Sequence, residues 1–228
     1  IARALAMLNR WLDQYPLINW GNSRWFEGLI AIYWLYAKTQ EGWLLGLAHK
    51  LAAQGADWKG VCRAELYRHR IPNYAASTQL SHVVNNAMAI KAYGLLWRLT
   101  GSLDDRLLPA AFLNYLDRYH GQVHGMCTGD EHLGGRNPVQ GTELCSIVEA
   151  MYSLELLAGL FGEVPFIDRL EKLAFNALPA TFSPDMWSHQ YDQQVNQVEC
   201  SEGDKRPWGT NLGDSNLFGL EPNFGCCT

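Results

Sequence analysis

The sequence predicts an all-helical fold built from stacked helical hairpins, and three observations support this prediction. Apolar residues recur at helical spacing over several long segments, whereas alternating strand-like runs are nearly absent. Short breaks at 101–103 and 162–165 separate helices that are paired, with glycine before and proline after the second break. No repeat of fixed length recurs strictly, so we expect a closed toroid rather than a regular solenoid.

The helices expected from this periodicity cover residues 1–14, 23–39, 42–54, 81–100, 104–119, 143–161 and 165–178. The connections between pairs are longer and rich in Gly, Asn, Asp and His, as expected for stacked hairpins. After residue 180 the helical pattern fails, and 187–224 is expected to form loops with short strands. We expect the functional chemistry in these long loops, and we expect Trp20, Trp25, Trp34 and Trp43 mostly in the core.

Composition restricts the class of protein. The 228 residues are 48% hydrophobic and 18% charged, which is ordinary for a globular chain of one or two domains. The net charge is −5 and no run of Lys and Arg exceeds two residues, so we exclude a nucleic-acid partner. The longest apolar stretch, 28–37, is too short to span a bilayer, so we expect a soluble chain without a membrane partner.

Both ends of the chain resemble internal positions of a longer protein. Ile1 lies inside an amphipathic pattern without a capping signal, and Thr228 follows two cysteines after a polar loop. We therefore expect any targeting signal to lie outside these residues, and neither compartment nor oligomeric state is predicted.

Cysteine and glutamate suggest a metal site. Six cysteines in a chain of this length do not make a disulfide scaffold. Thiolates and carboxylates are good zinc ligands, and Glu143 and Cys145 could join the adjacent Cys226 and Cys227. A disulfide between neighbours is disfavoured, because their Cα atoms lie only about 3.8 Å apart. The alternative is that these are buried reduced cysteines, since the intervals match no standard zinc-finger pattern.

The position of the helix start decides whether Glu143 and Cys145 share a face. Ser146 and Glu149 resemble a capping box, which would begin the helix at Ser146 and leave 143–145 extended, where residues two apart point the same way. A helix beginning at Thr142 is the competing boundary. Either choice places the pair at the helix entrance.

Two further segments carry groups suited to carbohydrate chemistry. The Gly-rich loop 128–138 contains Asp130 and Glu131, and a glutamate in a partly dry pocket can act as a proton donor. Segment 187–194 mixes aromatic rings with His and amide side chains, as sugar sites do. The alternatives are a solvated loop with a turn at 134–135 and an irregular surface loop, and His82 at a helix start has a capping or core role as its default.

These motifs, in this order, resemble the glycoside hydrolase family of β-L-arabinofuranosidases, long known as a domain of unknown function. The similar stretches are 81–106, 128–161, 187–198 and 223–228. The resemblance implies an (α/α)6 toroid followed by β-sandwich domains in the full protein. It makes residues 1–228 a single partial catalytic domain that lacks the first toroid helices and the sandwich domains.

The resemblance also implies site residues and a mechanism. It implies a zinc ion (Zn2+) held by Glu143, Cys145, Cys226 and Cys227. Cys226 would be the nucleophile and Glu131 the general acid/base of a retaining glycosidase that releases β-L-arabinofuranose or a related sugar from a glycan. The substrate-contacting residues would be His82, Tyr191 and His189. The loop between Glu131 and Glu143 is shorter than in the characterised branch, which makes Asp130 the rival acid/base.

Two other functions remain open at this point. A zinc–thiolate site could be a structural clamp in a non-enzymatic module, since closed four-ligand sites are usually structural. A metal-free carbohydrate lyase or epimerase built on a helical toroid is the third interpretation, which absence of zinc would favour.

Overall fold

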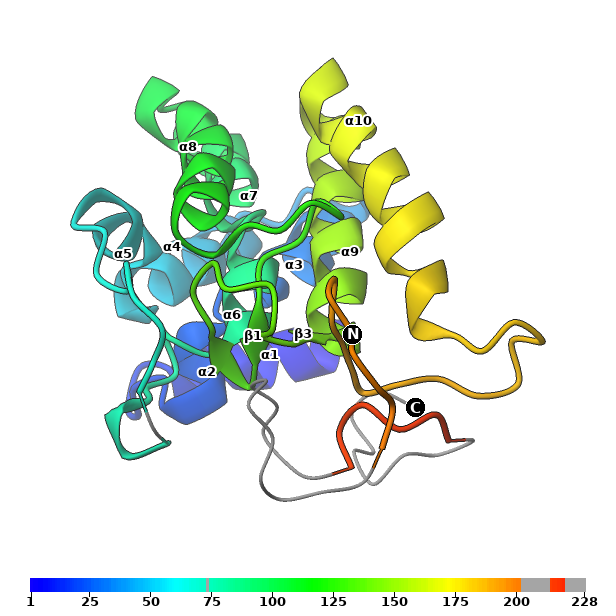
Figure 1. Ribbon diagram of the computed structural model, residues 1–228. Coiled ribbons are helices and arrows are strands. Elements are labelled where there is room, and N and C mark those ends of the chain that lie inside the picture. Colours follow the sequence, from blue (N-terminus) through cyan, green and yellow to red (C-terminus); the bar gives the residue numbers. More distant parts are fainter. Residues whose placement is uncertain (73, 202–213, 220–228) are drawn as a thin grey trace.

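The computed structural model describes residues 1–72, 74–201 and 214–219 and is predominantly helical, which confirms the predicted fold class (Figure 1). Its α-helices are α1 (Ala2–Trp11), α2 (Asn19–Ser23), α3 (Glu27–Thr39), α4 (Trp43–Gln54), α5 (Trp58–Arg63), α6 (Val83–Ala89), α7 (Ala92–Thr100), α8 (Leu103–His120), α9 (Leu144–Phe161) and α10 (Val164–Lys172). Shorter turns are η1 (Tyr74–Ala76), the π-turn η2 (Leu173–Ala177) and η3 (Pro179–Thr181).

The predicted hairpins form. Helix α3 packs on α4, α7 on α8 and α9 on α10, and α6 joins two of these pairs by packing along α9. Gly101 and Gly162 end α7 and α9 in the left-handed conformation, with φ of 63° and 66°. Glycine adopts this conformation without the steric cost of a Cβ, so both turns can be tight.

The helix boundaries differ from the prediction in three places. The predicted helix 81–100 is two helices, because the chain turns at Ile90 and Lys91. The predicted helix 23–39 begins at Glu27, after the separate short helix α2. Helix α5 was not predicted; it is capped by the Asp57 carboxylate, which accepts a hydrogen bond from the Gly60 N–H at 2.9 Å. A six-residue helix is too short for periodicity to reveal.

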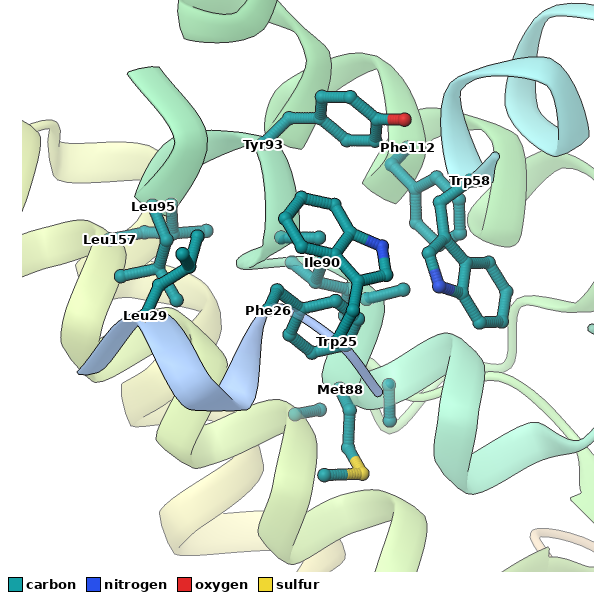
Figure 2. Close-up of a cluster of buried hydrophobic side chains, with 14 of the residues drawn as sticks. Trp25, Phe26, Leu29, Trp58, Met88, Ile90, Tyr93, Leu95, Phe112 and Leu157 are labelled. Carbon is teal, nitrogen blue, oxygen red and sulfur yellow. The ribbon is translucent and has the colours of Figure 1, made fainter. Parts of the chain in front are cut away.

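Most of the helices contribute to one large apolar cluster, part of which is drawn in Figure 2, and a small second cluster contains Leu144 and Tyr191. Trp25 and Trp58 are buried, and their indole N–H groups donate to the carbonyls of Ala56 at 3.2 Å and Ser23 at 2.8 Å. The expectation that the tryptophans lie mostly in the core is wrong for Trp20 and Trp34, which are 45% and 50% exposed. Trp20 borders a cavity instead.

Helix α9 is long and apolar enough to cross a membrane by length and composition alone. Its residues Ile147, Leu154 and Leu157 are buried among the other helices, and it packs between α6 and α10. These contacts account for its apolar character as that of a core helix.

A small sheet stands at the N-terminal ends of α6 and α9. Its strands are β1 (Gly129–Asp130), β2 (His132–Leu133), β3 (Thr142–Glu143) and β4 (Asp192–Gln193), in the spatial order β2-β1-β3-β4. Strand β1 pairs antiparallel with β2 and parallel with β3, and β3 pairs antiparallel with β4. The sheet therefore brings the predicted loops 128–138 and 187–194 together at the start of α9. Apart from β4, the described residues after Thr181 form loops and turns, and loops with short strands were expected there.

Candidate active site

A cavity of about 660 Å³ opens beside this sheet. Helix α2, the starts of α6 and α9, the β1–β2 turn and the segment after α10 form its walls. Its polar and aromatic lining residues are Trp20, Arg24, His82, Glu131, Glu143, Cys145, Glu149 and Phe182. The structure thus brings four predicted site residues, His82, Glu131, Glu143 and Cys145, to one cavity.

Glu131 is the single residue of the turn between β1 and β2, and its φ of 63° is uncommon for a residue other than glycine. Both carboxylate oxygens are held. His82 Nε2 lies 3.1 Å from Oε2, and the Tyr191 hydroxyl donates to Oε1 at 2.8 Å. The hydrogen bond from His82 is the largest effect on the Glu131 pKa and lowers it. Glu131 is therefore an ionised, oriented carboxylate on the cavity wall.

The capping role expected by default for His82 is also present. Its Nδ1 accepts the backbone N–H of Asn85 at 3.4 Å, at the start of α6. Because Nδ1 accepts, the proton of the neutral ring lies on Nε2, which can donate to Glu131. One histidine thus caps the helix and orients the carboxylate.

Glu143 lies next to Glu131, but its surroundings shift its pKa in the opposite direction. It is 2% exposed, and its Oε2 accepts the backbone N–H of Glu131 at 3.2 Å. Burial, followed by the charge of Glu131, raises the Glu143 pKa to about 8. A buried carboxylate of this kind is stabilised by a cation or held neutral by a proton.

Strand β3 ends at Glu143 and α9 begins at Leu144, between the two boundaries considered from the sequence. The capping-box prediction is wrong: the Ser146 hydroxyl donates to the Glu143 carbonyl at 2.7 Å, inside the first turn. Glu149 lines the cavity instead. Cys145, in the first turn of α9, and Glu143 both face the cavity, so the pair does share a face.

The donor set fits zinc as far as it is described. Glu143 contributes oxygen and Cys145 sulfur to the same cavity, and both are zinc ligands. The other two predicted ligands, Cys226 and Cys227, lie outside the described residues, as does the predicted nucleophile. Within residues 1–72, 74–201 and 214–219, no group of three or more His, Cys, Asp or Glu could hold a metal ion.

Asp130, the rival acid/base, lies behind the cavity wall and does not line it. Its carboxyl group is near enough to that of Asp192, which is fully buried on β4, for each to shift the pKa of the other. Burial raises the pKa of Asp130 to about 7 and that of Asp192 well above its usual range. The two carboxyl groups are adjacent and dehydrated, so they share a proton rather than both ionise.

The two predicted residues of segment 187–194 do not line the cavity directly. Tyr191 is fully buried and reaches the cavity wall through its hydrogen bond to Glu131. His189 is half-buried, and its ring packs edge-on to Phe182, which does line the cavity, with 5.9 Å between ring centroids. Contact of either residue with a sugar stays a prediction.

Four of the polar and aromatic lining residues were not predicted as site residues: Trp20, Arg24, Glu149 and Phe182. The Arg24 guanidinium lies 4.4 Å from the Trp20 ring centroid, and its Nε donates to Asn85 Oδ1 at 2.7 Å. The Trp20 ring meets His82 edge-on at 5.2 Å. A sequence signal existed for Glu149, because it is four residues after Cys145 on a helix and so on the same face.

Known proteins resemble this chain in sequence and in structure. The family model described as "Beta-L-arabinofuranosidase, GH127 catalytic domain" matches residues 19–228. A solved structure entitled "Glycoside hydrolase" superimposes with a TM-score of 0.68 at 12% identity, covering 99% of this chain and 40% of that one. The α/α-barrel fold is thereby shown, and the chain spans about 40% of the length of that structure.

A second solved structure, a GH127 β-arabinofuranosidase, gives a TM-score of 0.45 at 16% identity over 74% of this chain and 27% of that chain. A search of curated proteins returned no match.

Proposed function

Because this chain belongs to the glycoside hydrolase family of β-L-arabinofuranosidases, we propose that its cavity binds and hydrolyses β-L-arabinofuranosides or a related sugar in glycans. The observation that carries the proposal is the Glu131 carboxylate, fixed on the cavity wall by His82 and Tyr191. A glycosidase needs an oriented proton-transfer group of this kind beside the glycosidic oxygen.

Glu131 is the proposed acid/base rather than Asp130. Glu131 lines the cavity, whereas Asp130 is paired with Asp192 behind it. In the resting protein Glu131 is ionised, since His82 lowers its pKa. A bound sugar that excludes water would raise this pKa and so favour the protonated form that donates to the leaving oxygen.

The proposed reaction has two steps. The Cys226 thiolate attacks the anomeric carbon as the bond to the leaving oxygen breaks, and that oxygen takes the proton of Glu131. Glu131 then removes a proton from water, which attacks the anomeric carbon and displaces the thiolate. The sugar is released with retained configuration, as in retaining enzymes that use a carboxylate nucleophile.

Zinc is the proposed cofactor, and Glu143, Cys145, Cys226 and Cys227 would hold it. When bound, it keeps coordinating thiols deprotonated at neutral pH. In this proposal Tyr191 and His82 orient Glu131 through their hydrogen bonds, and direct contact of His82, Tyr191 and His189 with the sugar stays a prediction. Trp20 offers an exposed aromatic face to the sugar.

A second candidate function rests on the opposite shifts in pKa of the two glutamates. A neutral Glu143 beside an ionised Glu131 is an acid–base pair that a metal-free lyase or epimerase could use. A structural zinc site in a non-enzymatic module is the third. Zinc content and turnover together separate these functions.

The test measures zinc per chain and release of 4-nitrophenol from 4-nitrophenyl β-L-arabinofuranoside. We expect about one zinc in the wild type, its loss in Cys226→Ser/Cys227→Ser, and its retention in Cys200→Ser, which alters an exposed cysteine. We also expect the glycosidase rate to fall with the zinc. A folded wild type that contains zinc and releases no sugar would contradict the proposal, and one that turns over without zinc would favour the metal-free candidate.

A further inference from the structure

A second hollow, of about 370 Å³, lies beside the loop that follows β2 and shares no lining residue with the active-site cavity. We call it the basic groove. It is lined by Arg68, Arg70, Arg118 and Arg136, together with Gly134 and Gly135. Four arginines converge here in a chain whose net charge is −5.

The positive charge of the groove is only partly balanced. Glu65 is shared between two of the arginines, with its carboxylate 3.9 Å from Arg68 Nη1 and 3.5 Å from Arg118 Nη1. Arg70 and Arg136 form no ion pair with the part of the chain that the structure describes. Both side chains belong to exposed residues, so an anion can reach them.

Hydrogen bonds hold the backbone of the groove in place. Its two walls, 67–70 and 134–137, are joined by the buried His120: Nε2 donates to the Tyr67 carbonyl at 2.5 Å, and Nδ1 accepts the Gly135 N–H at 2.9 Å. Gln122 Nε2 also donates to the Arg136 carbonyl at 3.0 Å. The backbone that carries Arg70 and Arg136 is therefore fixed before any ligand binds, which lowers the entropic cost of binding.

The groove adjoins the active site. Gly134 follows Glu131 by three residues, so their Cα atoms are at most about 10 Å apart. The charge of Arg70 also reaches the cavity side, where it lowers the pKa of Asp130 against the larger effect of burial. An oligosaccharide of a few sugar units is longer than this separation.

We propose that the basic groove binds the carboxylate groups of an acidic glycan, that is, a uronate-containing oligosaccharide whose arabinofuranosyl unit occupies the cavity. The planar guanidinium fork matches a carboxylate in two-point contact. Tyr119, Asn137 and Gln140 place an aromatic ring and amides beside it, as sugar recognition requires. Nucleic acid is disfavoured, because a polyphosphate backbone needs a longer basic face than this acidic chain offers. The identity of the sugar in the cavity rests on the proposed function, whereas binding of the uronate does not.

The test is isothermal titration of the purified protein with a short oligogalacturonate and with its fully methyl-esterified counterpart, which differs only in charge. We expect the acid to bind at least tenfold more tightly than the ester, and the preference to weaken at high salt. Arg70→Gln/Arg136→Gln should remove the preference, whereas Arg3→Gln/Arg10→Gln, which alters two exposed arginines of α1, should keep it.

Equal affinity for acid and ester, or an unchanged preference in the groove variant, would overturn the proposal. So would equally tight binding of inorganic phosphate or single-stranded RNA that depends on the same two arginines. Hydrolysis of the neutral 4-nitrophenyl substrate, measured in parallel, separates the two proposals: the groove variant should retain it, and a protein that binds the uronate but hydrolyses nothing would contradict only the proposed function.

Discussion

The active-site cavity and the basic groove are carried by the same short segment, 129–136, but they treat charge in opposite ways. In and behind the cavity wall, Glu143 and Asp192 are buried, and burial raises the pKa of Glu143 to about 8 and that of Asp130 to about 7. In the groove, cationic side chains are exposed, with Arg118 70% accessible. Burial allows protonation to be tuned at a cost in stability, whereas exposed charges attract a ligand with little effect on stability.

The largest effect on stability is expected behind the cavity wall, where Gly141 packs against the buried Asp192 carboxyl group. In Gly141→Ala, the added Cβ would lie 1.7 Å from Asp192 Oδ2, so the fully buried Asp192 carboxyl group must shift. We expect the free energy of unfolding in urea to fall by about 3 kcal/mol. Gly159→Ala in α9 is the matched control, because its Cβ meets nothing within 4 Å; it should gain up to about 1 kcal/mol. Similar free energies of unfolding for the two variants would show that the residues around Asp192 are loosely packed.

The stability of the two regions depends on pH in opposite directions. Burial lowers the pKa of His120, beneath the groove, to about 4 from an ordinary value of 6.5. Between these values the unfolded chain binds the proton and the folded chain does not, so the stability contributed above pH 6.5 is lost as the pH falls toward 4. Asp130, behind the cavity wall, has a pKa raised to about 7, so the folded chain binds its proton more readily than the unfolded chain does. Asp130 therefore adds stability as the pH falls through the range in which His120 removes it.

We expect His120 to account for a loss of about 2 kcal/mol between pH 7.5 and pH 5.0. The gap in unfolding free energy between wild type and His120→Gln should therefore narrow by that amount at pH 5.0. His49→Gln, at an exposed position, should follow the wild type at both values. A gap that is constant with pH would show that folding does not lower the pKa of His120.

The kinetics of Tyr191→Phe test whether Tyr191 acts through Glu131 at the cavity. Loss of the 2.8 Å hydrogen bond to Glu131 should lower kcat about tenfold and leave KM unchanged, because a positioning residue acts on the reacting carboxylate and not on the sugar. Tyr33→Phe removes another buried hydroxyl, which donates to the Leu95 carbonyl at 2.8 Å in the core. That variant should keep the wild-type kcat. An increase in KM for Tyr191→Phe would instead indicate direct contact with the sugar.

The smallest effect is expected in the groove. Arg136→Gln should change the free energy of unfolding by less than about 0.5 kcal/mol, since the side chain is exposed and forms no ion pair with the described residues. Urea denaturation measures this directly. A loss above about 1 kcal/mol would mean that the arginine supports the fold rather than a ligand site.

The sequence predicted the hairpins well because helical periodicity and the Gly101 and Gly162 stop signals are local. It could not predict the break at Lys91, which is fully buried and whose ammonium lies 2.6 Å from Glu27 Oε1, a contact between distant segments. Helix α5 was missed because six residues carry too little periodicity.

At the site, motif resemblance selected His82, Glu131, Glu143 and Cys145, and the fold places all four on one cavity. Trp20 and Arg24 escaped prediction because their approach depends on α2 reaching the start of α6, which no local pattern encodes. The basic groove was not predicted for the same reason: its arginines are scattered between residues 68 and 136, and tertiary contacts such as those of His120 and Glu65 bring them together.

The most direct test of the central claim, that Glu131 transfers the proton at this cavity, compares the rates of Glu131→Gln on two β-L-arabinofuranosides that differ in leaving group. With an alkyl leaving group, which must be protonated, the variant should lose on the order of 10²–10⁴-fold in rate relative to the wild type. With 4-nitrophenol, which leaves without a proton, cleavage of the glycosidic bond should slow far less. An equal loss on both substrates, or this pattern in Asp130→Asn instead, would contradict the assignment of Glu131.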